Sequence, residues 1–157
     1  MSSSDPICVH IDCHSDTIEV DLKRLETLAV AICEQLEIID VNVQISIVDD
    51  AGMIEVHRQF LNNNHTTDVI SFDLSDEFEP SRNFQIVVNA DMARRQAAKR
   101  GHPAESELAL YITHGMLHNA GYDDVDDEQS RQMHEKEDEI LQAHGFGIIY
   151  HKNETQD

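Results

Sequence analysis

The spacing of the hydrophobic residues changes several times along this chain, and these changes limit the folds that it can adopt. Apolar residues occupy every second position over 7–12 and 41–48, a pattern that predicts strands with one buried face. The segments 68–74 and 83–89 are rich in β-branched and aromatic residues and predict two further strands. Spacings of three and four residues predict five helices, over 20–36, 50–61, 91–100, 104–120 and 126–144. Because these elements do not alternate strictly as strand, helix and strand, we expect an α+β fold with a small sheet.

Polar residues and glycines mark where the predicted helices begin and end. Asp91 can start the third helix, and Gly101 can end it. Asp126 opens the last helix, since a glutamine follows it at the spacing of a capping box. We expect the acidic residues over 126–139 to form a solvated face of that helix. Phe60 falls on the predicted apolar stripe of the second helix.

The length and the cysteine content point to one cytoplasmic domain. A chain of 157 residues can bury a core as one domain spanning 1–157, with short flexible ends near 1–6 and 151–157. No apolar run is long enough to span a membrane, and the first residues lack the basic-then-apolar order of a signal peptide. The three cysteines are an odd number without a CxxC pair, which argues against a disulfide framework and favours a reducing cytoplasm.

The charge balance is strongly acidic, with 31 Asp and Glu against 11 Lys and Arg and a formal net charge of −20. Such a chain repels nucleic acid on average, so RNA binding would require positive charge gathered in one place. Four basic residues do gather on the third predicted helix: Arg94, Arg95, Lys99 and Arg100. They form either a solvated helix face, the commoner role of a short charge run, or a surface that guides an RNA backbone.

Two histidines four residues apart, His114 and His118, stand on one face of the helix predicted over 104–120. Imidazoles one turn apart can bind a single ion at about 2.0–2.1 Å. Gly121 suits a left-handed helix exit that turns the chain back, so that Asp124 can approach the same ion. The spacing HxxxHxxGxxD resembles that of zinc endopeptidases, where three protein ligands leave one position open for water. Such a histidine pair also occurs on ordinary helix surfaces, and the neighbouring aspartates could form a capping loop instead.

Gly115 separates this pattern from the zinc proteases, which carry a glutamate directly after the first histidine. That glutamate takes a proton from the zinc-bound water, so a metallopeptidase is only an alternative for this chain. Without it, zinc would act mainly by lowering the pKa of its bound water. We also expect the glycine to leave space beside the metal for a bulky group such as a phosphodiester.

The segment HGMLHNAGYDD at 114–124 resembles the motif HGxLHxxGYDH of the YbeY family of metal-dependent endoribonucleases. The segment TTDVISF at 66–72 is similar to the family's PTDVLSF strand, and the resemblance covers most of the chain. It implies a small mixed sheet with a metal site at the end of a central helix. It also implies one zinc ion, no small organic cofactor, and cleavage of single-stranded RNA in 16S rRNA 3′-end processing and ribosome quality control. His114, His118 and Asp124 fall on the family's three metal-ligand positions, with His114 also expected to be catalytic.

Three positions depart from the family pattern. Asp124 replaces the third histidine, and its negative charge would make the metal less electrophilic. Leu61 aligns with an arginine that would bind phosphate, and Arg58, one helical turn earlier, is the candidate substitute. Gln85 stands where the family has an aspartate.

Three further residues are candidates for substrate binding: Ser71, in the strand shared with the family, and Arg94 and Arg95, on the basic helix. Ser71 could equally be a polar residue at the edge of the sheet. We expect rRNA and the small ribosomal subunit as partners, with a ribosomal protein as a further candidate for the acidic surface. The non-enzymatic alternative is a ribosome-assembly factor that keeps zinc as a structural element.

Overall fold

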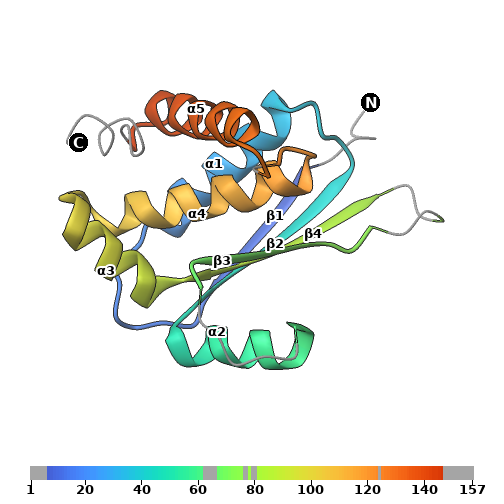
Figure 1. Cartoon of the computed structure of the whole chain (residues 1–157). Helices are drawn as coiled ribbons and strands as arrows, with labels where there is room; N and C mark the ends of the chain where they lie inside the picture. Colours follow the sequence, from blue (N-terminus) through green and yellow to red (C-terminus); the bar gives the residue numbers. More distant parts are fainter. Residues whose placement is uncertain (1–6, 62–66, 76–77, 79–80, 124, 147–157) are drawn as a thin grey trace.

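The computed structural model describes residues 7–61, 67–75, 78, 81–123 and 125–146. These residues form four strands, five α-helices and one π-helical turn, which confirms the α+β prediction (Figure 1). The strands are β1 (Ile7–Cys13), β2 (Val41–Val48), β3 (Val69–Asp73) and β4 (Arg82–Asn89). The helices are α1 (Leu22–Gln35), α2 (Asp50–Val56), α3 (Ala90–Arg100), α4 (Ala104–Asn119) and α5 (Asp127–Ala143), and the π-helical turn is η1 (His57–Leu61).

The four strands form one mixed sheet in the order β1-β2-β4-β3. β1, β2 and β4 run parallel, whereas β3 pairs antiparallel with β4 at the edge of the sheet. The alternation in β2 sets which side chains are buried: Val43 and Ile45 are almost fully enclosed, while their neighbours Asn42 and Gln44 are exposed. This pattern gives the sheet one apolar face that helices can cover.

Helices cover the two faces of the sheet unequally. α1, α4 and α5 lie over the apolar face, and α2 lies on the opposite side (Figure 1). Met53 of α2 packs there against Ile70 of β3 and Val87 of β4. α4, the predicted metal helix, is buried along most of its length and rests on the sheet. Within the described residues, none of the helices is long and apolar enough to cross a membrane.

Two helix ends agree with the sequence prediction and one does not. Gly101 ends α3 in the left-handed conformation at φ 75°, and the Asp126 side chain caps α5 by accepting from the backbone N–H of Gln129. The prediction that Asp91 starts α3 is wrong. Asn89 is the cap, because its side-chain oxygen accepts hydrogen bonds from the backbone N–H groups of the third helix's first turn.

The prediction that Phe60 lies on the apolar stripe of the second helix is also wrong, since this residue is 61% exposed. The α-helix ends at Val56, and the chain continues as the π-helical turn η1. A π-helical turn holds more residues than an α-helical turn, so Phe60 rotates away from the stripe that Met53 begins. Its ring packs instead beside that of Phe72 on β3, with 5.4 Å between centroids.

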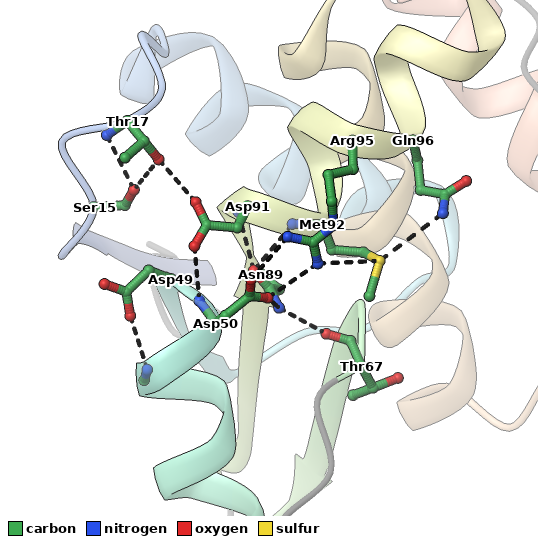
Figure 2. Close-up of polar contacts among 11 residues, drawn as sticks. Ser15, Thr17, Asp49, Asp50, Thr67, Asn89, Asp91, Met92, Arg95 and Gln96 are labelled. Carbon is green, nitrogen blue, oxygen red and sulfur yellow. Dashed lines mark hydrogen bonds and ion pairs between the residues drawn. The ribbon is translucent and has the colours of Figure 1, made fainter.

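A buried asparagine joins α2, α3 and β3 at one end of the sheet. Figure 2 shows Asn89 at the centre of this network, where its Nδ2 donates to Asp50 Oδ1 at 2.8 Å and to the carbonyl of Thr67 at 3.2 Å. Arg95 makes two hydrogen bonds to the same Asp50 carboxylate, at 2.8 and 3.1 Å. Asp91 accepts from the backbone N–H of Asp50. The start of β3 is therefore fixed relative to two helices.

Cys33 on α1 should make the fold less stable as the pH rises in the alkaline range. The side chain is fully enclosed, and burial raises the pKa of its thiol from 9.0 to about 11. Between these two values the unfolded chain loses the thiol proton while the folded chain keeps it. The free energy of unfolding should therefore fall as pH rises through this window, by about 1.4 kcal/mol per pH unit. Urea unfolding of the wild type and of Cys33→Ala measures this contribution, and a variant with an unchanged pH slope would contradict it.

Candidate metal and substrate site on α4

His114 and His118 project from the same face of α4, as their spacing predicts. Their Nε2 atoms are 3.1 Å apart, and the two rings stand nearly perpendicular, at 82°. Two nitrogens bound tetrahedrally to one zinc ion at about 2.0–2.1 Å would lie about 3.3 Å apart. The two imidazoles thus present their Nε2 atoms at a separation that fits a shared metal ion.

Glu137 of α5 contacts His114 at Nδ1, the ring nitrogen that does not face His118. Its Oε2 lies 2.5 Å from Nδ1 of His114, and the glutamate is completely buried. Burial raises the pKa of Glu137, although the hydrogen bond from His114 acts in the opposite direction. With Nδ1–H donated to the carboxylate, the Nε2 lone pair of His114 is left for a ligand. A carboxylate on the far nitrogen is the usual support of a metal-binding histidine.

The sequence prediction missed Glu137, because it assigned the acidic residues over 126–139 to a solvated face. Glu137 and Asp138 are instead buried, at 0% and 2% exposure. The position of Glu137 in the sequence, rather than its residue type, could have predicted that it is buried. It lies four residues after Met133 and three before Ile140, so it belongs to the buried stripe of α5.

Asp124, the predicted third ligand, lies outside the described residues. Among the residues that are described, no group of three or more His, Cys, Asp or Glu is placed to hold a metal ion. Gly121 does adopt a positive φ, of 109°, as the predicted chain reversal after α4 requires. The donor set on α4 is therefore two imidazoles, with a buried carboxylate that orients one of them.

Gly115 does not leave open space beside the histidines, so that prediction is wrong. The glycine is buried where α4 approaches the sheet. A Cβ at this position would lie 3.2 Å from Ile86 Cγ2, 3.3 Å from Val69 Cγ2 and 3.4 Å from Ser71 Cβ. The missing side chain lets helix and sheet come close, and there is no room here for the glutamate of a zinc protease.

Two substrate-binding candidates lie on opposite sides of the sheet. Ser71 of β3 is beside Gly115, so the structure brings it to the same helix as the histidines. Arg58 belongs to η1, which continues α2 on the other side of the sheet from α4 (Figure 1). Its guanidinium pairs with Glu55 at 2.7 Å. The described structure does not bring Arg58 together with the histidine pair.

The basic residues of α3 are partly neutralised within the fold. Arg95 pairs with Asp50, which raises the pKa of the guanidinium further, and Arg100 pairs with the buried Glu107 at 3.1 Å. Arg94 is exposed. α3 packs beside the first half of α4, whereas the histidines lie in its second half (Figure 1). Arg95 is exposed too, but its guanidinium is already paired with Asp50, so Arg94 is the better placed of the two α3 candidates to contact a substrate.

Known proteins share both the sequence and the fold of this chain. The family model described as endoribonuclease YbeY matches residues 10–145. The chain belongs to the endoribonuclease YbeY family. Endoribonuclease YbeY of Shouchella clausii (strain KSM-K16) is 36% identical over 117 residues, which covers 67% of this chain and 73% of that relative. Endoribonuclease YbeY of Sulfurovum sp. (strain NBC37-1) is 33% identical over 135 residues, or 83% of this chain and 86% of the relative.

The solution structure of TM1509 from Thermotoga maritima matches with a TM-score of 0.62 and 27% identity over 95% of both chains. Together with the YbeY relatives it confirms the family resemblance and the α+β fold. The names of these relatives support a nuclease, that is, a hydrolase of phosphodiester bonds.

Proposed function

We propose that this chain is a zinc-dependent endoribonuclease that cleaves single-stranded rRNA in the cytoplasm. Its role would be 16S rRNA 3′-end processing and ribosome quality control. The observation that carries the proposal is the pair of Nε2 atoms 3.1 Å apart, with one imidazole fixed by a buried glutamate. The YbeY endoribonuclease relatives support the choice of RNA as substrate.

His114 and His118 would hold the ion, and Asp124 would add a third ligand. A bound zinc ion lowers the pKa of a coordinated water and polarises a phosphoryl oxygen. Glu137 keeps His114 in the tautomer that presents Nε2 and stabilises positive charge near the imidazole. Ser71, on the strand that faces α4, carries a hydroxyl that can donate to a phosphate oxygen.

The proposed partners are rRNA and the small ribosomal subunit, with a basic ribosomal protein as a further partner for the acidic chain. Arg94 is exposed on α3 and can contact an RNA backbone. Arg95 contributes less charge because Asp50 pairs with it. Arg58 lies on the other side of the sheet from α4 (Figure 1). It would contact the same RNA only if the RNA passes around the edge of the sheet that β3 forms.

The second candidate function is a ribosome-assembly factor with a structural zinc ion and no cleavage activity. Two observations favour it: Leu61 stands where the YbeY family pattern has an arginine, and the net charge is −20. A metallopeptidase gains no support, because the packing around Gly115 excludes the glutamate base.

Substituting the second histidine should remove both the metal and the activity. We expect His118→Ala to lose zinc and to cleave single-stranded RNA at least about 100-fold more slowly, since a metal ligand is lost. His10→Ala is the matched control, because this exposed histidine lies on β1 and should leave both properties unchanged. Elemental analysis of the purified protein and cleavage of a labelled RNA measure the two effects.

The same measurements on Asp124→Ala and Asp123→Ala assign the third ligand, because only the ligand should lower the zinc content. Cleavage that persists after removal of zinc by a chelator would exclude the metal mechanism. A wild-type protein that holds zinc and cleaves no RNA would favour the assembly factor.

A further inference from the structure

A pocket of about 320 Å³ opens beside the first half of α4, apart from the histidine pair. It lies between the start of β3, the helix α3 and the helix α4. Met92 and Leu110 line it with apolar atoms, and Asp68 and Gln96 line it with polar groups. Its volume is at the lower end of the range for small-molecule sites, about 300–1,000 Å³.

The pocket and the histidine pair belong to one continuous face. Glu107 and Tyr111 line the pocket, and with His114 and His118 they fall within a sector of about 60° around α4 at 3.6 residues per turn. Tyr111 and His114 are three residues apart, so their Cβ atoms are about 5–6 Å from each other. β3 runs past both sites as well, because Asp68 precedes it at the pocket and Ser71 lies beside Gly115. A polymer bound at the histidines would extend over the pocket.

The charges in the pocket wall disfavour a phosphate. Glu107 is completely buried, and both Arg100 Nη1, at 3.1 Å, and His102 Nε2, at 2.5 Å, contact its carboxylate. The arginine charge is therefore balanced inside the protein. Asp68 is exposed and adds a negative charge to the pocket wall, so the pocket suits an uncharged polar group that carries a hydrogen-bond donor.

Asp68 is held in position to accept such a donor. Its Oδ1 accepts from the backbone N–H of Val69 at 2.7 Å and from the hydroxyl of Thr67 at 3.3 Å. Within the part of the chain that the structure describes, no group donates to Oδ2. Adenine, cytosine and guanine each carry an exocyclic amino group that can donate to a carboxylate, whereas uracil carries none.

We propose that this pocket is a subsite for one nucleobase of the bound RNA, and that Asp68 selects a base with an exocyclic amino group over uracil. This inference rests on the proposed function, because it takes single-stranded RNA as the substrate. Unstacked bases of single-stranded RNA are commonly held between side chains and read through hydrogen bonds at their edges.

The test uses the full chain and short labelled oligouridine strands, some with one uridine replaced by adenosine, cytidine or guanosine. Fluorescence anisotropy in the presence of a chelator measures binding, and cleavage with zinc is measured separately. The wild type should bind the substituted strands about tenfold more tightly than oligouridine. Asp68→Asn should abolish this preference, because its amide can donate to a uracil carbonyl. Gln96→Phe should weaken binding of every strand by filling the pocket, whereas Ala98→Phe puts the same ring on the exposed side of α3 and should not.

The two measurements separate failure of the subsite from failure of the proposed function. If the wild type cleaves none of the RNA strands in the presence of zinc, the endoribonuclease proposal fails. The anisotropy measurement still tests the subsite in that case, because it compares the binding of the substituted strands with that of oligouridine. Equal binding of all strands by the wild type would overturn the subsite. A preference that survives in Asp68→Asn would overturn the role of Asp68, and equal effects of the two phenylalanine variants would overturn the location.

Discussion

The variant Gly115→Glu should fail to fold, although it completes the HExxH sequence of a zinc protease. The new carboxylate would be pressed against Ile86 and Val69, where a Cβ alone meets atoms at 3.2 and 3.3 Å. An unpaired buried charge costs several kcal/mol, and overpacking adds about 1–3 kcal/mol, against a total stability of about 5–15 kcal/mol for an ordinary domain. Circular dichroism and urea unfolding should show lost structure or a greatly lowered midpoint.

Gly115→Ala is the matched control for this experiment. Replacing glycine by alanine inside a helix stabilises the helix by about 1 kcal/mol. This gain offsets the tight contacts of the new methyl group with the sheet, so the variant should fold. A Gly115→Glu protein with the stability of the wild type would contradict the packing described here. Zinc-dependent peptidase activity in that variant would contradict it as well.

Glu137→Gln should weaken zinc binding by about 10–100-fold, the usual effect of losing the carboxylate behind a metal-binding histidine. The glutamine has nearly the same shape but no charge to support the imidazole of His114. Glu137→Ala should have a larger effect and should also lower the melting temperature, because it leaves Nδ1 of His114 facing a cavity. Competition with a chromogenic zinc chelator measures the affinity, and cleavage of single-stranded RNA measures the activity.

Glu139→Gln is the matched control on the same helix, since Glu139 is exposed and its carboxylate contacts only surface groups that the structure describes, Lys136 at 3.1 Å and Gln35 at 3.3 Å. It should bind zinc as the wild type does. Equal affinities for Glu137→Gln and the wild type would show that Glu137 is a buried structural carboxylate that does not act through His114.

Most of the fold was predictable because the spacing of the hydrophobic residues along this chain matches the positions of the buried side chains. The alternation in β2 and the stripe of α1 are unambiguous, and both elements form as expected. Other features depend on contacts between distant segments. The antiparallel pairing of β3 with β4 and the turn to a π-helix at His57 leave no periodic signal, so the orientation of Phe60 could not be derived.

The site was predictable only where one helix determines its geometry. His114 and His118 lie four residues apart on α4, so their shared face follows from the helical period alone. Glu137 comes from another helix, 23 residues later, and its acidic neighbours suggested a solvated surface. Gly115 was misinterpreted for a similar reason, because its neighbours Val69 and Ile86 are far away in the sequence.

The asparagine network at the start of β3 has a consequence for how tightly the proposed nucleobase subsite would bind RNA. Asn89 is completely enclosed and hydrogen-bonds to both Asp50 and Thr67, so the segment that carries Asp68 is already immobilised before any ligand arrives (Figure 2). A receptor that is rigid in advance loses little conformational entropy on association. Affinity at this end of α4 should therefore depend on the match between base and pocket.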